Sequence, residues 1–145
     1  MAELPTIPLD YRPSEDEEYM NPMHLAYFKA KLIAWKQELA ENTKATVENL
    51  QNESLRTPEA MDRISLETET SIELRTRDRM RKLISKIDSA LKRIEEGEYG
   101  YCDETGDPIG LGRLEARPVA TMTVEAQEKH ERHEKSHRDR DVNLF

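Results

Sequence analysis

Two long segments of the chain carry large apolar residues that recur at alternating spacings of three and four positions. In the first segment these residues are Leu25, Phe28, Leu32, Trp35 and Leu39. This spacing places the five side chains on one stripe of a helix. Asn21 fits the N-cap of that helix and Pro22 its first position, because proline has no N–H group to leave unpaired. The pattern therefore predicts a helix that begins at Pro22.

The second segment follows Pro58, which interrupts the pattern because it cannot donate a helical hydrogen bond. A turn is therefore expected near that residue. The most regular apolar positions beyond it step by four, three, four and three residues, and they are Met80, Ile84, Ile87, Leu91 and Ile94. Gly97 follows the last of them and is typical of a helix end. The pattern predicts a second long helix.

Each apolar stripe is too narrow to cover a globular core, so the two helices most simply bury their stripes against each other. We therefore predict a mainly α protein with a long antiparallel coiled-coil hairpin over residues 22–97 and a tip near 55–64. Close to the tip, threonine, serine and asparagine replace large aliphatic side chains. The distal end of the hairpin should therefore be less stable than its base.

The segments on either side of the hairpin differ from it in character. Residues 1–21 contain three prolines among acidic and polar residues and predict an extended N-terminal arm that packs on the globular part. Glycines and prolines punctuate short apolar segments over 98–122, which predicts a small, loop-rich globular knob. Residues 123–145 predict a C-terminal helix, capped by Thr123, and a tail.

The composition agrees with this fold class. The chain has 145 residues, of which 36% are hydrophobic and 36% are charged, whereas an ordinary globular domain has about 45–50% apolar and about 25% charged residues. Such a composition favours long helices covered in charge over a large spherical core. The length alone rules out a large multidomain enzyme.

Several function classes are disfavoured by the sequence. The formal net charge of −8 argues against generic binding to nucleic acid, since neutralising many phosphates requires positive charge. No stretch approaches the ~20 apolar residues of a transmembrane helix, and the N-terminus has no signal segment, so we expect a cytoplasmic protein without membrane contact. No catalytic triad, phosphate-binding glycine-rich loop or pair of catalytic carboxylates occurs, so we expect no enzyme activity.

The charge is unevenly distributed along the chain. Residues 71–95 contain eight lysines and arginines and four acidic residues, and eight minus four leaves a local charge of +4. These residues form either a solvated helix face held by ion pairs or a docking surface for an anion or an acidic protein. Near the tip, Glu59 and Asp62 either complement the dipole of a helix start or are carboxylates that a narrow stalk delivers into a buried site.

Several longer motifs occur in order along the chain. They are Glu17-Glu18-Tyr19-Met20-Asn21, Glu73-Leu74-Arg75-Thr76-Arg77-Asp78-Arg79, Tyr99-Gly100-Tyr101-Cys102 and Arg113-Leu114-Glu115-Ala116-Arg117-Pro118. Together with the first apolar stripe, they resemble the DksA/TraR family of bacterial transcription factors. The resemblance extends over roughly residues 8–130, in order, which makes it far more specific than one short motif.

The resemblance implies a transcription regulator that binds RNA polymerase directly, without sequence-specific DNA binding. The coiled-coil tip would enter the secondary channel of the polymerase while the globular end rests outside. With ppGpp, the protein would repress ribosomal RNA promoters and activate some amino-acid biosynthesis promoters in the stringent response. A hairpin that pairs with itself needs no second chain, so we expect a monomer.

Two other functions stay open at this point. A Gre-like factor would use the acidic tip to hold a metal ion at the polymerase centre and promote transcript cleavage or counter backtracking. A coiled-coil adaptor without regulatory function would not bind RNA polymerase at all.

The resemblance also implies roles for individual residues. The family's tip pattern falls on Glu59, Asp62 and Ile64, of which Asp62 matches outright. Glu59 keeps the negative charge, whereas Ile64 places a bulky β-branched group where the family has alanine. Arg79 falls on the family's contact with the rim of RNA polymerase.

A second set of positions concerns the nucleotide. Leu83, Lys86 and Arg117 fall on positions that, together with RNA polymerase, form a ppGpp site in the family. Gln127 stands where the family commonly has lysine, so one favourable charge on the nucleotide is missing. The resemblance thus implies ppGpp as a co-effector at the interface with RNA polymerase.

The knob departs from the family in its cysteines. The two C-x2-C pairs that hold a structural zinc ion in the family fall here on Cys102, Thr105, Thr123 and Ala126. One thiolate of four cannot supply such a site, so the chain resembles a variant without three of the four zinc-finger cysteines, and we expect no zinc. We instead expect the knob to be held by apolar contacts of Tyr99, Tyr101, Ile109, Leu111, Leu114, Met122 and Val124.

Overall fold

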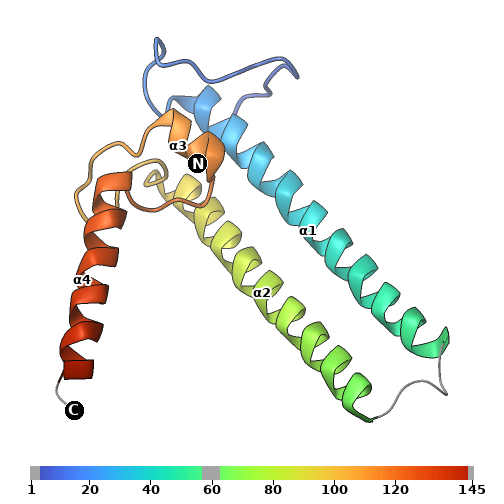
Figure 1. The fold of residues 1–145 in the computed structure, drawn as a ribbon. Coiled ribbons are helices and arrows are strands. Elements are labelled where there is room, and N and C mark those ends of the chain that lie inside the picture. The colour runs from blue at the N-terminus through green and yellow to red at the C-terminus, as the bar shows by residue number, and fades with distance from the viewer. Residues whose placement is uncertain (1–3, 57–62, 144–145) are drawn as a thin grey trace. The chain divides into compact units, whose positions relative to one another are not determined.

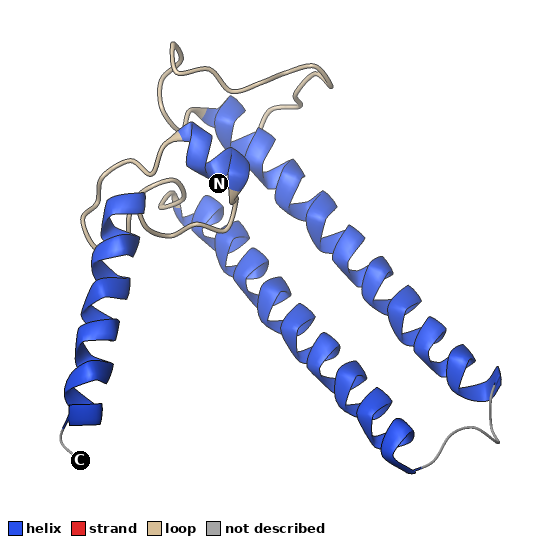
Figure 2. Cartoon of the chain, in the orientation of Figure 1, coloured by secondary structure: helices blue, strands red, loops and turns tan. Residues whose placement is uncertain are grey.

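A computed structural model describes residues 4–56 and 63–143 of the protein. These residues form α1 (Pro22–Arg56), α2 (Arg63–Glu96), α3 (Leu111–Ala116) and α4 (Val124–Asn143), as Figure 1 shows. Over the described ranges no strand forms (Figure 2), and the β-type pairing is limited to one antiparallel bridge between Tyr101 and Pro108. The prediction of a mainly α protein is therefore confirmed.

The helix ends follow the chemistry of their terminal residues. At the start of α1, the Asn21 side-chain oxygen accepts hydrogen bonds from the N–H groups of Met23 at 2.8 Å and His24 at 3.0 Å. These bonds pair two backbone donors that the helix itself leaves free. The predicted cap of α4 is also confirmed, because the Thr123 hydroxyl accepts from the N–H of Ala126 at 3.1 Å.

The chain divides into two compact units. One unit, here termed the hairpin unit, is Ala30–Leu91, and the other, the head unit, combines Met1–Lys29 with Lys92–Phe145. Both α1 and α2 contribute residues to each unit. No helix within the described ranges has an apolar stretch long enough to cross a membrane.

Within the hairpin unit, α1 and α2 lie antiparallel (Figure 1), and Lys36 Nζ on α1 reaches Asp88 Oδ1 on α2 at 2.7 Å. The predicted coiled-coil hairpin is therefore confirmed. Burial within this unit is uneven, since Leu32 and Ile87 are fully buried whereas Ile72 is 45% exposed. The fully buried Leu32 and Ile87 lie within four residues of Ala30 and Leu91, which bound the unit, as the fading apolar stripe predicts.

This gradient predicts unequal costs for truncating large aliphatic side chains. Replacing the fully buried Leu32 by alanine is expected to lower the free energy of unfolding by about 2–5 kcal/mol, because it leaves a cavity. Ile72→Ala is the matched control on α2 and should cost about 1 kcal/mol or less, since that side chain keeps much of its contact with water. Urea unfolding followed by circular dichroism measures both values, and equal losses would contradict the gradient.

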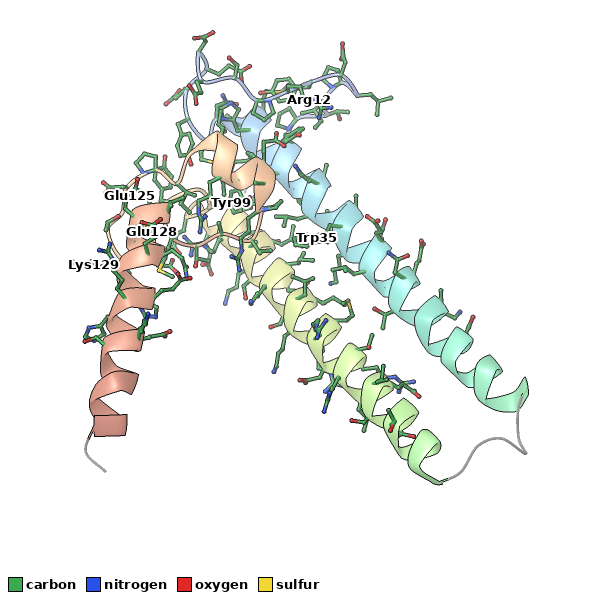
Figure 3. All side chains as sticks on the ribbon, viewed as in Figure 1. Arg12, Trp35, Tyr99, Glu125, Glu128 and Lys129 are labelled. Carbon is green, nitrogen blue, oxygen red and sulfur yellow. The ribbon has the colours of Figure 1, made fainter. Side chains whose placement is uncertain are left out.

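The core of the head unit contains some of the residues that the sequence predicted for the knob, together with residues of α1, α2 and α4. Tyr99, labelled in Figure 3, is 1% exposed, and Leu114 is fully buried. The Tyr99 ring packs on Phe28 of α1 with a centroid distance of 5.7 Å. The prediction for Val124 was wrong, because this residue begins α4 and is 43% exposed. Ile109 and Leu111 are buried as expected, whereas Tyr101 and Met122 are half-buried.

Candidate functional sites

One face of α2 carries a row of cations. Its members are spaced by four, three and four residues, which aligns them along the helix, and they are Arg75, Arg79, Lys82 and Lys86. All four are exposed. Lys82 Nζ pairs with Asp78 at 3.1 Å, whereas the other three have no ion-pair partner among the described residues. We call this row the basic face of α2.

Other cations of α2 serve the helix itself. Arg77 pairs with Glu73 at 2.7 Å and Lys92 with Glu96 at 3.9 Å, each across one helical turn. Exposed pairs of this kind stabilise a helix by only a few tenths of a kcal/mol, about 0.3–0.5. The alternative of a helix face held by ion pairs therefore holds for the paired cations. The unpaired cations of the basic face are the ones available to an external anion.

The remaining positions implied for ppGpp lie on different elements. Leu83 is half-buried on α2, within the hairpin unit. Arg117 follows α3 in the head unit and is exposed, and its side chain makes no hydrogen bond or ion pair within the part of the chain that the structure describes. Gln127 on α4 is half-buried and donates from Nε2 to Glu131 at 3.1 Å.

The tip positions Glu59, Asp62 and Ile64 follow α1 in the sequence. Glu59 and Asp62 lie outside the described residues. Ile64 belongs to the first turn of α2 by its backbone. Their roles therefore rest on the sequence.

The four positions aligned with zinc ligands come together in the head unit. Cys102 is 4% exposed, and the Thr105 hydroxyl and the N–H groups of Thr123, Thr105 and Glu104 stabilise its ionised sulfur. Ala126 is 6% exposed and donates its N–H to Thr123. The local backbone thus surrounds one sulfur with donors, although the other three positions offer two hydroxyls and a methyl.

This set does not fit a structural zinc ion. Such sites take four ligands from thiolates, imidazoles or carboxylates, and the described residues contain no cluster of three His, Cys, Asp or Glu side chains able to hold a metal. His130 lies between two carboxylates, with Nδ1 3.6 Å from Glu104 and Nε2 3.1 Å from Glu134. Both contacts lie at the exposed surface and bring together no further metal-binding side chain among the described residues.

The hydrogen bonds around Cys102 change its acidity. Burial raises the pKa of the thiol, but the Thr105 hydroxyl and the three N–H donors stabilise the thiolate and together lower the pKa from 9.0 to about 7. Since the pKa is lower in the folded state, ionisation stabilises the fold most at high pH, above the ordinary value. That contribution is lost as the pH falls through about 7.

Thiolate absorbance at 240 nm tests this ionisation directly. We expect a titration midpoint near pH 7, with Cys102→Ser as the blank, because Cys102 is the single cysteine of the chain. Thr105→Val removes the hydroxyl donor at nearly constant volume and should raise the midpoint. A midpoint at the ordinary value in the unmodified protein would contradict the hydrogen-bonded thiolate.

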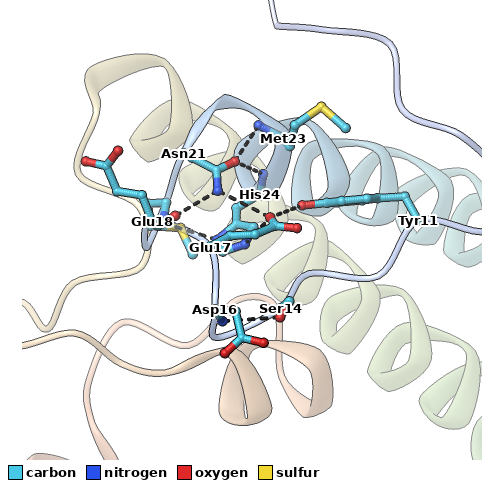
Figure 4. A network of polar contacts seen from close by, with 9 residues as sticks. Tyr11, Ser14, Asp16, Glu17, Glu18, Asn21, Met23 and His24 are labelled. Atoms are coloured by element: carbon cyan, nitrogen blue, oxygen red, sulfur yellow. Dashed lines mark hydrogen bonds and ion pairs between the residues drawn. The ribbon is translucent and has the colours of Figure 1, made fainter.

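A second polar cluster joins the N-terminal arm to the start of α1 (Figure 4). Glu17 Oε2 accepts from the Tyr11 hydroxyl at 2.5 Å and from Asn21 Nδ2 at 3.3 Å. His24 is fully buried, and its Nε2 lies 3.0 Å from the same carboxylate oxygen. His24 Nδ1 accepts from the N–H of Met20 at 3.2 Å.

The cluster holds Glu17 in its ionised form. The hydrogen bond from Tyr11 lowers the pKa of Glu17 most, burial opposes this effect, and Asn21 and His24 lower the pKa further. The same cluster raises the pKa of Tyr11 to about 12, through burial and the adjacent carboxylate. The sequence motif that contains Glu17 and Asn21 did not predict this cluster, because only the fold brings Tyr11 and His24 to the Glu17 carboxylate.

Comparison with known proteins gives two family profiles and several relatives. The profile of the DnaK suppressor protein DksA, N-terminal domain, matches residues 24–94, and that of the prokaryotic dksA/traR C4-type zinc finger matches residues 97–132. The RNA polymerase-binding transcription factor DksA of Caulobacter vibrioides is 63% identical over 130 residues, which cover 90% of this chain and 92% of that protein. The protein of the same name from Escherichia coli K12 is 44% identical over 117 residues, covering 81% and 78% respectively.

Solved structures agree with these matches. Transcription factor DksA2 from Pseudomonas aeruginosa superimposes with a TM-score of 0.62 at 38% sequence identity, covering 81% of this chain and 90% of that chain. The zinc-finger profile and the side chains disagree on one point. The matched span 97–132 holds one cysteine where the profile's name implies four ligands.

Proposed function

Because the chain belongs to the DksA/TraR family, we propose that the protein binds RNA polymerase directly and regulates transcription initiation. Its relatives are named RNA polymerase-binding transcription factors. The observation that carries the proposal is the basic face of α2, where Arg75, Arg79 and Lys86 have no ion-pair partner within the described residues. Because these three side chains are exposed and unpaired, their charges are available to meet an acidic protein surface or an anion.

The proposed mode of action uses the hairpin as a narrow rod. Helices α1 and α2 have 35 and 34 residues, which makes each about 50 Å long at ~1.5 Å per residue. A rod only two helices wide can enter the secondary channel, where a globular domain cannot. Its tip then delivers Asp62, with Glu59 and Ile64 beside it in sequence, toward the active site, and Arg79 contacts the channel rim.

The nucleotide ppGpp acts as co-effector in this proposal. Lys86 and Arg117 supply charge-assisted hydrogen bonds to its phosphates, and Leu83 supplies an apolar contact. Each of the two cations is exposed and makes no ion pair within the described residues, so neither has to give up a partner to bind. Gln127 offers an amide where a lysine would add charge, so the response to ppGpp is weaker than in relatives with that lysine.

The biological consequence is a role in the stringent response. We place the protein in the cytoplasm as a monomer that represses ribosomal RNA promoters and activates some amino-acid biosynthesis promoters, without sequence-specific DNA binding. The protein catalyses no reaction itself. We further propose that its finger holds no zinc, since the donor set around Cys102 does not fit the metal.

In vitro transcription tests the proposal. Purified RNA polymerase on a ribosomal promoter is expected to make less transcript when the protein is added, and less again when ppGpp is present. An unchanged amount of transcript after both additions would contradict the proposal. Adding the protein to a backtracked elongation complex separates the Gre-like alternative, because shortened RNA would indicate transcript cleavage.

A further inference from the structure

A finger without its metal needs other crosslinks. In a C4 finger, zinc joins two ligand pairs and contributes a large part of the folding free energy. Apolar burial cannot replace it everywhere in this chain, because residues 103–108, which begin directly after Cys102, are all exposed. The structure instead shows polar side chains from outside the knob bonded to the backbone on both sides of this loop.

The first of these side chains is Tyr19 of the N-terminal arm. Its hydroxyl donates to the Gly100 carbonyl at 2.6 Å and accepts from the Gly110 N–H at 3.0 Å. One oxygen atom therefore joins the chain before the exposed loop to the chain after it. The Tyr19 ring also packs edge-on against Tyr101, with a centroid distance of 5.6 Å.

The contact between arm and knob requires glycine at residue 100. Gly100 has φ +91°, and a Cβ atom there would lie 2.7 Å from the sulfur of Met20, the residue after Tyr19. Any larger residue would have to displace the Met20 side chain and would strain the backbone at this φ angle. The arm therefore fits this part of the backbone closely.

The second side chain is Arg93, near the end of α2. Its guanidinium donates to the Tyr101 carbonyl at 2.7 Å, to the Glu98 carbonyl at 3.3 Å and to the Asp103 carboxylate. Although it carries a charge, its side chain is only 16% exposed. This fork fixes the start of the exposed loop to the helix.

Asp103 extends the link to the second half of the finger. Its N–H donates to the Thr121 carbonyl at 2.8 Å, two residues before Thr123, where the second ligand pair of the family begins. The Arg93 fork and this bond thus span the two segments that a zinc ion would join.

The arm is itself held in position. Glu17, two residues before Tyr19, accepts from Tyr11 and Asn21 and faces the buried His24. Asn21 in turn caps α1. Tyr19 is therefore fixed from both sides along the chain, which lowers the entropic cost of its two hydrogen bonds.

We propose that Tyr19 and Arg93 replace the zinc ion as the crosslinks of the finger, which makes the N-terminal arm an integral part of the knob. This inference rests on the proposal that the finger holds no zinc. It gives the protein a knob that withstands chelators, since no ligand set is exposed to loss of metal. The knob then depends on the arm instead.

Hydrogen–deuterium exchange on the full-length, chelator-treated protein tests the crosslinks. Tyr19→Phe keeps the ring and removes the bridging hydroxyl, so exchange at the amides of Cys102 and Asp103 is expected to speed up about tenfold, the effect of one net hydrogen bond. These amides do not bond to Tyr19 themselves, so they report on the fold of the loop. Tyr101→Phe is the matched control, because the Tyr101 hydroxyl makes no hydrogen bond within the described residues.

Arg93→Met gives an independent second variant, with Lys92→Met on the adjacent, exposed position as its control. We expect faster exchange in the loop for Arg93→Met and unchanged exchange for Lys92→Met. Unchanged exchange in both Tyr19→Phe and Arg93→Met would overturn the inference. Zinc is measured by mass spectrometry on the same samples before chelation, and one zinc per chain would instead overturn the metal-free finger.

Discussion

Replacing Asp62 by asparagine is expected to abolish repression of a ribosomal promoter while the protein still binds RNA polymerase. The substitution keeps the size of the side chain and removes its charge. Inside a channel from which water is partly excluded, an ionised carboxyl interacts far more strongly with nearby charges than it would in water. We expect the inhibitory effect to fall at least about tenfold, which corresponds to ~1.4 kcal/mol.

Transcription and binding must be measured on the same variant. Repression is followed in vitro with and without ppGpp, and binding by co-migration with polymerase. Glu53→Gln removes a carboxylate from the C-terminal part of α1, away from the family's tip pattern, and is the control expected to keep repression. Normal repression by Asp62→Asn would show that the tip mechanism is wrong.

Replacing Lys86 or Arg117 by alanine is expected to weaken the response to ppGpp while leaving ppGpp-independent repression largely intact. Each cation is proposed to make charge-assisted hydrogen bonds to phosphate, and such bonds contribute about 1.5–3 kcal/mol. The ppGpp concentration for half-maximal effect should therefore rise by about 10–100-fold. Transcription assays over a range of ppGpp concentrations give this value directly.

Arg81 provides a matched control for Lys86 on the same helix. It is an exposed cation that lies about 140° away from Lys86 around the helix axis, at ~100° per residue. Arg81→Ala should leave the ppGpp response unchanged, and Gln127→Lys should strengthen it by adding a charge. An equal loss in Arg81→Ala and Lys86→Ala would indicate a general effect of charge and no defined nucleotide contact.

Much of the fold could be predicted from the sequence because it depends on local rules. The three-and-four spacing that contains Leu32 and Ile87 identifies the buried stripes, and both residues are fully buried. The caps at Asn21 and Thr123 are also local, because each side-chain oxygen accepts a hydrogen bond from an N–H group at most three residues later. Val124 was assigned wrongly because its apolar character says nothing of its position at the exposed start of a helix.

The polar crosslinks of the knob could not be predicted in this way. The hydroxyl of Tyr19 bonds to residues that are 81 and 91 positions away in the sequence. No periodicity or composition signals a contact over such a distance, which depends on how the arm returns to the knob. The motif containing Tyr19 indicated the family, yet the chemistry of its tyrosine emerges only from the structure.

The candidate site residues on α2 depend on local sequence. Lys86 and Arg79 could be placed on an exposed helix face from their spacing alone, and the structure shows both exposed. The ion pairing follows from the same local spacing, because Arg77 and Lys82 are paired with an acid four residues before them. Arg79 and Lys86 have another cation at that position.

Photocrosslinking from the tip tests the central claim most directly. A photocrosslinking amino acid is placed at residue 60, between the two tip acids in sequence, and the variant protein is incubated with RNA polymerase and irradiated. A second variant carries the same amino acid in place of the exposed Glu131 of α4 and serves as the comparison. The account predicts that residue 60 crosslinks to polymerase peptides lining the active site, and that residue 131 does not. Crosslinks from residue 60 confined to the outer surface of the polymerase, or absent altogether, would contradict it.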